Sequence, residues 1–237
     1  MQGKRVVVLT GAGISAESGI RTFRDDGGLW ENHRLEDVAT PEAWRADPGL
    51  VWRFYQARRR QLNEVKPNPA HEALAQLAEG LDNFTLITQN VDDLHERGGS
   101  SDVVHMHGQL VTLRCEASGR SEVRMSDSDL SDTFLRCSCC VEPARLRPDI
   151  VWFGEMPMHM EAIYAAVDAC EVFVVVGSSG HVYPAADLVH IAKANGARTV
   201  LVNAEAPLNV EAFDEVHLGK AGELLPGLVE TWLSDSE

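Results

Sequence analysis

Short, uninterrupted runs of apolar residues recur along the chain, separated by segments in which apolar residues return every three to four positions. Uninterrupted runs predict strands that are buried on both faces of a sheet. They lie at residues 5–10, 84–88, 103–106, 150–153, 172–177 and 199–203. Segments with the helical period lie at roughly 50–63, 69–79, 159–169, 184–195 and 221–233. This alternation predicts an α/β fold of the Rossmann type, with a parallel sheet that carries helices on both faces.

Two stretches interrupt the alternation of strands and helices. Residues 34–68 predict consecutive helices without a strand, and residues 109–150 hold four of the five cysteines and a polar segment with little periodicity. We interpret both as insertions that together form a small domain. The Rossmann-type domain then consists of residues 1–33, 69–108 and 151–237.

The composition narrows the class of protein. The 237 residues carry a net charge of −15, which opposes nucleic-acid binding and favours encounter with basic protein segments. No apolar run approaches the about 20 residues of a membrane span, and none resembles a secretory signal. The odd cysteine count, clustered around Cys137-Ser138-Cys139-Cys140, indicates metal ligands or free thiols rather than a disulfide framework. We therefore expect a cytoplasmic protein without membrane or nucleic-acid partners.

A glycine-rich segment follows the first predicted strand. Gly11-Ala12-Gly13-Ile14-Ser15-Ala16 matches the G-x-G-x-x-G/A pattern, which lets the backbone approach a pyrophosphate at a helix N-terminus. The alternative for such a short motif is a simple tight turn. In dehydrogenases a second strand ending in an acidic residue follows about 20 residues later. Residues 20–30 are instead polar and rich in glycine, so a dinucleotide would be held differently here.

Six distinctive segments follow one another along the chain: GAGISAESGIRTFRDDGGLW, TQNVDDLHERGG, HMHG, VWFGE, GSSGHVYPA and LVNAE. In this order they resemble successive motifs of the sirtuin family, over essentially the whole chain. The chain is most similar to the short bacterial class that resembles desuccinylase-type sirtuins. The resemblance implies NAD-dependent removal of acetyl, succinyl and malonyl groups from protein lysines, with release of nicotinamide and O-acyl-ADP-ribose. Acylated lysine proteins or peptides and NAD, consumed as co-substrate, are the partners that it implies.

Three catalytic residues follow from the resemblance. His107, which precedes Gly108, matches the general base, a role that suits an imidazole near neutral pH. Asn90 would orient the ribose and its attacking water, and Asp92 would contact the nicotinamide carboxamide. From the residues alone, Asn90 and Asp92 could equally cap a helix. His105 is interpreted as a structural histidine.

The resemblance also implies contacts with NAD along its length. Phe23 would shield the reactive ribose carbon, Arg24 suits the phosphates, and Glu205 would supply the acid for the adenosine ribose. The full set comprises Gly11, Ala12, Gly13, Ser15, Glu17, Thr22, Phe23, Arg24, Trp30, Gln89, Asn90, Asp92, Gly177, Ser178, Ser179, Asn203, Glu205 and Ala221.

Tyr55 and Arg58 are candidates for recognition of the acyl group. They lie three residues apart in a predicted helix and so share a face, where a phenol and a guanidinium can receive a carboxylate. The alternative is that Arg58 is solvated and Tyr55 packs in the core. The resemblance favours an acyl pocket and implies two further kinds of contact, with the acyl chain and with the extended peptide. The substrate-binding residues are then Ala39, Tyr55, Arg58, Val151, Phe153, Gly154, Glu155 and Val182.

The metal site is the place where the sequence departs from the family pattern. Sirtuins place two CxxC pairs around structural zinc, and here Cys115, Cys137 and Cys140 match three of the four cysteines. Ser118 stands at the fourth position, and serine is a poor zinc ligand. Zinc with a substitute ligand, a weak site and no metal all remain open. Cys170 lies in an apolar segment and is expected in the core.

Three other functions remain to be compared with deacylation. A silent NAD or ADP-ribose sensor would have no need of His107, Asn90 and Asp92 together. A hydride-transferring dehydrogenase is disfavoured because the second strand is missing. Mono-ADP-ribosyl transfer would intercept the same intermediate with another nucleophile.

Overall fold

A six-stranded parallel sheet forms the larger part of the molecule. The computed structural model describes residues 1–20, 29–30 and 33–234. The strand order is β11-β10-β9-β1-β4-β5, and every neighbouring pair is parallel. The strands are β1 (Val6–Thr10), β4 (Phe84–Thr88), β5 (Val103–His105), β9 (Val172–Val176), β10 (Arg198–Asn203) and β11 (Glu215–Leu218). The predicted α/β fold of Rossmann type is confirmed.

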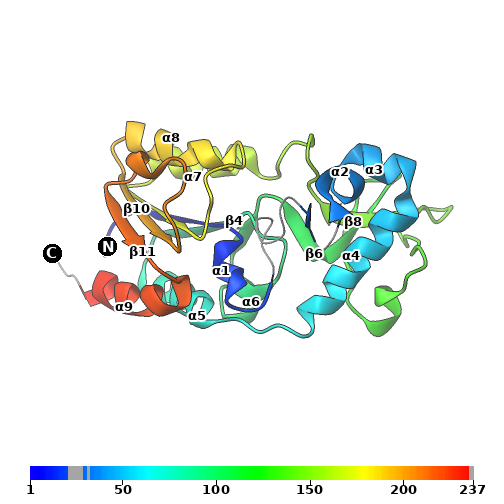
Figure 1. The fold of residues 1–237 in the computed structure, drawn as a ribbon, viewed down its shortest axis with the longest axis horizontal. Helices are drawn as coiled ribbons and strands as arrows, with labels where there is room; N and C mark the ends of the chain where they lie inside the picture. The colour runs from blue at the N-terminus through cyan, green and yellow to red at the C-terminus, as the bar shows by residue number, and fades with distance from the viewer. Residues whose placement is uncertain (21–28, 31–32, 235–237) are drawn as a thin grey trace.

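Helices cover both faces of this sheet (Figure 1). Side chains alternate along a strand, so Val6 and Val8 of β1 pack toward α5 and α9, whereas Val7 and Leu9 pack toward α7 and α8. All five residues of β1 are buried, which explains the uninterrupted apolar run. The elements around the sheet are α1 (Gly13–Ala16), α5 (Pro69–Gly80), α6 (Leu94–Arg97), α7 (Met160–Ala169), η2 (Ala185–Asp187), α8 (Leu188–Ala194), η3 (Val210–Ala212) and α9 (Ala221–Ser234).

The two insertions lie side by side at the other end of the molecule (Figure 1). Their buried side chains, from 38–65 and 110–150, belong to one hydrophobic cluster that also includes Trp152. A three-stranded antiparallel sheet, in the order β7-β6-β8, packs against the helices. The elements here are β2 (Leu29–Trp30), β3 (His33–Arg34), α2 (Leu35–Val38), α3 (Pro41–Ala46), α4 (Pro48–Leu62), β6 (Gly108–Cys115), β7 (Ser121–Val123), η1 (Asp127–Leu130) and β8 (Leu146–Ile150).

Local sequence accounts for where the longer helices begin. Asp47 caps α4 by accepting a hydrogen bond from the Leu50 N–H at 2.9 Å, and Pro48 occupies the first turn. The Asn68 side chain caps α5 in the same way. The His71 ring nitrogen in turn accepts a hydrogen bond from the Asn68 N–H, which completes a capping box. Among the described residues, no helix is both long and apolar enough to cross a bilayer.

One predicted strand was placed wrongly, and several strands were not predicted. The predicted strand at 150–153 is not part of the large sheet, because β8 ends at Ile150 and pairs antiparallel with β6. Residues 109–150, which showed little periodicity, contain the three strands of the small sheet. The edge strand β11 was missed because Val216 and Leu218 face outward and half of its positions are exposed. Its pattern therefore lacks the apolar run that marks the buried strands.

Candidate active site

The glycine loop after β1 crosses the loop after β9 at close range. The N–H of Gly13 donates to the carbonyl oxygen of Gly177 at 2.8 Å, and a Cβ on Gly13 would lie 2.8 Å from the Gly177 Cα. Gly177 has a φ of +63°, and a Cβ there would collide with the backbone nitrogen of Ile14. Glycine at these two positions therefore brings the carboxyl ends of β1 and β9 together.

The end of β4 joins the same place. The N–H of Gln89 donates to Thr10 at the end of β1, and the Gln89 side chain donates to the Ser178 hydroxyl at 3.0 Å. Asn203, at the end of β10, donates to the Ser178 carbonyl at 3.2 Å. The four adjacent strands β4, β1, β9 and β10 thus end in one polar region. From β1 the chain continues to β4 and β5 on one side, and β9, β10 and β11 lie on the other side, so the strand order reverses between β1 and β9. Parallel α/β sheets bind ligands at such a switch point.

Ser15 contacts both catalytic candidates of the segment after β4, Asn90 and Asp92. The amide of Asn90 donates to the Ser15 hydroxyl at 3.0 Å, and both residues are buried. Burial raises the pKa of the Asp92 carboxyl, while hydrogen bonds from the Leu94 N–H and the Ser15 hydroxyl act in the opposite direction. The Asp92 carboxylate accepts from the Leu94 N–H at 3.2 Å, but the N-cap residue of α6 is Asp93, whose side chain makes no capping hydrogen bond. Neither Asn90 nor Asp92 is therefore the N-cap of this helix.

His107 is held in one tautomer. Its Nδ1 lies 2.9 Å from the carbonyl oxygen of Gln89, which can only accept, so Nδ1 carries the proton and donates. The Nε2 of the neutral ring then presents a lone pair. Burial lowers the pKa of His107, and the hydrogen bond to Gln89 partly offsets this shift. A neutral ring with a free lone pair on Nε2 is the state that a general base requires.

His105 occupies a different position. Its two ring nitrogens face the Asn90 carbonyl at 3.2 Å and the Glu96 carboxylate at 2.7 Å, and the ring is buried. With both nitrogens engaged, His105 supports the backbone of Asn90 instead of facing a ligand. This agrees with the interpretation of His105 as a structural histidine.

Tyr55 and Arg58 project from α4 into the core of the small module. Only 7% of Arg58 and 1% of Tyr55 is exposed, so Arg58 is not the solvated side chain of the alternative hypothesis. Burial raises the pKa of Tyr55 well above its ordinary value, and the nearby charge of Arg58 opposes that shift. The phenol oxygen of Tyr55 accepts a hydrogen bond from the indole of Trp152 at 3.1 Å. Ala39, the third candidate for the acyl pocket, is also buried.

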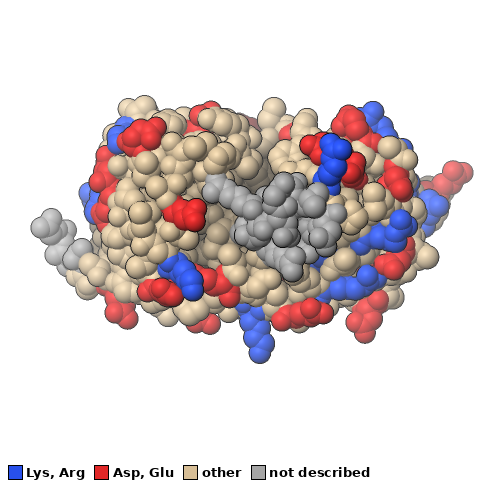
Figure 2. Space-filling view, in the orientation of Figure 1, with Lys and Arg blue, Asp and Glu red and all other residues tan. Residues whose placement is uncertain are grey.

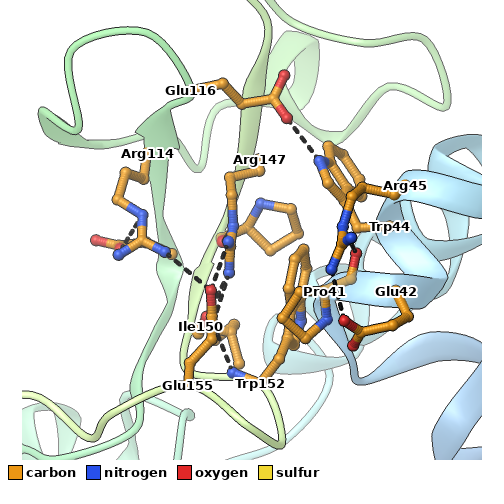
Figure 3. Close-up of polar contacts among 12 residues, drawn as sticks. Pro41, Glu42, Trp44, Arg45, Arg114, Glu116, Arg147, Ile150, Trp152 and Glu155 are labelled. Carbon is orange, nitrogen blue, oxygen red and sulfur yellow. Dashed lines mark hydrogen bonds and ion pairs between the residues drawn. The ribbon is translucent and has the colours of Figure 1, made fainter.

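The segment 151–155 lies between these residues and His107. The N–H of Val151 donates to the His107 carbonyl, and the N–H of Phe153 donates to the Ala39 carbonyl. The Glu155 carboxylate accepts hydrogen bonds from Arg147 at 2.9 and 3.0 Å (Figure 3). Burial alone would raise the pKa of Glu155, but hydrogen bonds from Arg147 and the Trp152 N–H hold it below its usual range.

Two further residues expected to contact NAD have defined partners in the structure, and others lie outside the described residues. The Glu17 carboxylate accepts the N–H of Gly222 at 2.9 Å, in the first turn of α9, so it caps that helix beside the buried Ala221. The side chain of Glu205 is exposed, while its carbonyl accepts from Asn203 at 2.7 Å. Thr22, Phe23 and Arg24 lie outside the described residues, as does the side chain of Trp30.

Four cysteines converge in the small module. Sγ atoms of Cys115, Cys137, Cys139 and Cys140 all lie within 4.8 Å of one another. The Cys115–Cys140 and Cys139–Cys140 distances are 3.7 and 3.8 Å. Four sulfurs around zinc in a tetrahedron, each at about 2.3 Å, would be about 3.8 Å apart, so this set fits the metal. The sequence left open whether Cys139 or Cys140 would be a ligand, and the structure brings the sulfurs of both into the cluster.

Ser118 lies beside this cluster, with its hydroxyl 3.2 Å from the Cys139 sulfur. Its backbone N–H also points to the Cys115 sulfur at 3.5 Å. Ser118 therefore occupies a position from which it can donate to thiolates, and Cys139 supplies the sulfur that a cysteine at 118 would have provided.

Comparisons with known proteins agree with this geometry. The Sir2 family model matches residues 11–184. An NAD-dependent protein deacylase of Yersinia pseudotuberculosis is 57% identical over 97% of this chain and 82% of its own length. A protein of the same description from Salmonella typhimurium is 53% identical over 98% of this chain and 85% of its own.

Solved structures show the same relationship. An ADP-ribose complex of a Sir2 homologue variant superposes with a TM-score of 0.90 at 39% identity, covering 99% of this chain and 95% of that one. A complex of Sir2 with a p53 peptide and NAD+ gives a TM-score of 0.80 at 29% identity, covering 96% and 93%. With a family model that spans most of its length and relatives above half identity, this chain belongs to the Sir2 family.

Proposed function

We propose that this protein is an NAD-dependent protein-lysine deacylase that releases nicotinamide and O-acyl-ADP-ribose. The observation that carries the proposal is the fixed tautomer of His107, whose Nε2 lone pair is presented near the ends of four parallel strands. Asn90 and Asp92 stand at the same strand ends. Relatives with this family's sequence are described as NAD-dependent protein deacylases, which supports the same activity here.

NAD suits the region where the strands end. The crossing of Gly11 and Gly13 with Gly177 leaves backbone without side chains, where a pyrophosphate can approach. Ser178 and Asn203 provide polar groups beside it. When bound, NAD supplies an anomeric ribose carbon at which the acyl oxygen can displace nicotinamide. The ADP-ribose and NAD complexes of Sir2 structures support this placement.

The chain's own residues then divide the work. The Nε2 of His107 accepts a proton from a ribose hydroxyl, while the hydrogen bond to Gln89 keeps the ring oriented. Asn90, held by Ser15, orients the ribose and water. Asp92, whose carboxyl has a raised pKa in its buried site, contacts the nicotinamide amide.

We propose succinyl and malonyl lysine as acyl substrates alongside acetyl lysine. Their terminal carboxylate matches a buried guanidinium and phenol, which Arg58 and Tyr55 present from one face of α4. Ala39 is small and belongs to the same buried cluster as Tyr55, so it leaves room for the acyl chain. A neutral acetyl group gains nothing from the charge of Arg58.

An extended peptide that carries the acyl lysine would bind between 151–155 and 180–183, where Val182 and Gly154 present backbone for pairing. Phe153 is 47% exposed and Tyr183 is 68% exposed, so part of each ring forms surface that a peptide could contact. On the face drawn in Figure 2 acidic and basic side chains are interspersed. The overall charge of −15 nevertheless favours encounter with basic, lysine-rich segments.

Zinc has a structural role in this proposal. Cys115, Cys137, Cys139 and Cys140 would hold it and join β6 to the loop before β8. We also propose that the chain is organised as an NAD-binding domain of 1–33, 69–108 and 151–237 with a small domain of 34–68 and 109–150. One shared hydrophobic cluster of the two insertions supports this division.

The test is mass spectrometry of matched acetyl- and succinyl-lysine peptides incubated with the protein, with and without NAD. We expect the mass of the acetyl-lysine peptide to fall by about 42 Da and that of the succinyl-lysine peptide by about 100 Da, only when NAD is present. One nicotinamide should be released for each acyl group removed. His107→Ala is the control and should release little of either group. Nicotinamide release without loss of the acyl group would contradict deacylation, and no reaction at all would indicate an NAD-sensing module.

A further inference from the structure

We infer that His95 and Thr10 are positioning residues that hold Asn90 in place at the end of β4, through the hydroxyl of Thr88. Their role rests on that of Asn90 in the proposed deacylation and adds to it residues that act through Asn90. None of the three was predicted from the sequence as a site residue. Each has at most 1% of its surface exposed, so none is itself placed against substrate or NAD.

Asn90 is held at three separate points. Its backbone N–H donates to the Thr88 hydroxyl at 3.1 Å, and its side-chain amide donates to the Ser15 hydroxyl at 3.0 Å. Its backbone carbonyl lies 3.2 Å from the Nδ1 of His105. Asn90 follows the end of β4 at Thr88 and precedes the start of α6 at Leu94, so it belongs to no regular element. Its position therefore depends on these contacts.

The direction of each hydrogen bond around Thr88 follows from the groups involved. A backbone N–H can only donate, so the Thr88 oxygen accepts from Asn90. The Thr10 hydroxyl donates to the same oxygen at 2.8 Å and thereby uses its one proton. The Nε2 of His95 lies 2.9 Å from the Thr10 oxygen, so it must carry a proton and donate. One chain of donors thus runs from His95 through Thr10 to the oxygen that receives Asn90.

The surroundings of His95 keep its ring in the state that this chain needs. Burial lowers the pKa of His95 to about 3, so the ring is neutral and carries its single proton on Nε2. The ring centre of His71 lies 5.0 Å away, and its Nδ1 accepts the Asn68 N–H. Burial also lowers the pKa of His71, to about 4, so this neutral ring has its proton on Nε2. A neutral neighbour of this kind is compatible with an unprotonated Nδ1 on His95.

Loss of this chain should displace Asn90 without removing it. If the Thr10 hydroxyl is absent, the Thr88 oxygen loses one of its two donors and the His95 N–H is left buried without an acceptor. A buried donor without a partner is unfavourable, so the groups around it rearrange. Misplacement of a positioning group by about 1 Å can lower a rate by about 100-fold. The effect should therefore appear in kcat and not in peptide binding.

The first test is Thr10→Val, which replaces the hydroxyl by a methyl group of similar size. We expect kcat for deacetylation to fall about 5- to 50-fold, with the KM for the peptide changed less than about 2-fold. Thr199→Val is the matched control, because Thr199 of β10 is also fully buried and donates its hydroxyl to the Ala212 carbonyl at 2.9 Å. The control should keep the kcat of the parent. Equal losses of kcat in the two variants would overturn the inference.

Two substitutions of His95 separate the donor from the bulk of the ring. Glutamine can place an amide N–H near the position of Nε2, whereas leucine fills the space without a donor. His95→Gln should therefore keep most of the kcat, and His95→Leu should lose about as much as Thr10→Val. Retention of the parent's kcat by both variants, or the same loss in both, would show that the N–H of His95 does not position Asn90.

A double-mutant cycle and a spectroscopic measurement complete the test. In an Asn90→Ala background, followed by single-turnover assays, Thr10→Val should cause no further loss, because the residue that it positions is already truncated. A full additional loss would contradict the inference. Nitrogen-15 NMR of the wild-type protein at neutral pH should show His95 neutral and protonated on Nε2. A His95 ring protonated on Nδ1 instead would be incompatible with the chain.

The wild-type protein separates failure of the proposed function from failure of this inference. If wild type removes no acyl group, deacylation fails, and NMR still decides on the chain: the backbone amide resonance of Asn90 should shift in Thr10→Val and stay in place in Thr199→Val. If wild type removes acyl groups and Thr10→Val behaves like Thr199→Val, only the inference fails.

Discussion

Two buried histidines outside the candidate active site should make the stability of this protein depend on pH. His71 and His95 are fully buried, and their ring centres lie 5.0 Å apart. Among the described residues, neither the Nε2 of His71 nor the Nδ1 of His95 has a hydrogen-bond partner. Burial therefore lowers the pKa of His71 from 6.5 to about 4 and that of His95 to about 3. Each ring is neutral in the folded protein at pH 5.

The sign of the effect follows from proton uptake. The folded-state pKa lies below the unfolded value, so the unfolded chain binds more protons and stability falls as pH drops below 6.5. Between pH 7.5 and 5, each histidine should cost about 2 kcal/mol of unfolding free energy. Asp92, whose pKa is raised by burial, acts in the opposite direction. A single substitution isolates one histidine from these other contributions.

His71→Gln is the appropriate substitution, because glutamine at this position of the capping box can still accept from the Asn68 N–H. Urea unfolding at pH 7.5 and pH 5 gives the free energy of unfolding of each protein. The loss between the two values should be smaller in His71→Gln than in the parent by about 2 kcal/mol. His190→Gln, at an exposed position of α8, should retain the parent's loss. An identical loss in His71→Gln and in the parent would refute the reasoning.

Further predictions concern the active site and the metal. His107→Ala should lower deacylation by about 10²- to 10⁴-fold while NAD still binds, as single-turnover and calorimetric measurements can show. Because burial lowers the pKa of His107, the acidic limb of the pH profile of kcat/KM should lie below pH 6.5, and a limb above that value would contradict the base assignment. Arg58→Met should lower desuccinylation by about 10- to 150-fold, because it removes a charge-assisted contact worth about 1.5–3 kcal/mol. Deacetylation should fall much less, and equal losses on both substrates would show that Arg58 supports the fold. Cys139→Ala should reduce the zinc content measured by elemental analysis and lower the melting temperature, whereas full metal content would show that Cys139 is not a ligand.

The sequence by itself determined the class of fold and most of its elements. Strands buried on both faces, such as β1 and β9, must be apolar at every position, and helices such as α4 and α5 begin where capping residues and proline occur together. Motifs placed His107, Asn90 and Asp92 after predicted strands, and parallel strands end at one edge of a sheet. Local periodicity and topology are sufficient for these conclusions.

Only the tertiary structure decided which distant groups meet. Trp152 and Tyr55 are 97 residues apart, and no periodic pattern relates an indole N–H to a phenol at that separation. The same holds for Glu17, which caps α9 across 205 residues, and for Cys139, whose sulfur joins Cys115 through the pairing of β6 with β8. Such contacts arise from strand register and from packing of the two insertions. A one-residue shift in the strand register, or a different packing of the insertions, would separate these side chains. The sequence and its hydrophobic pattern would remain the same.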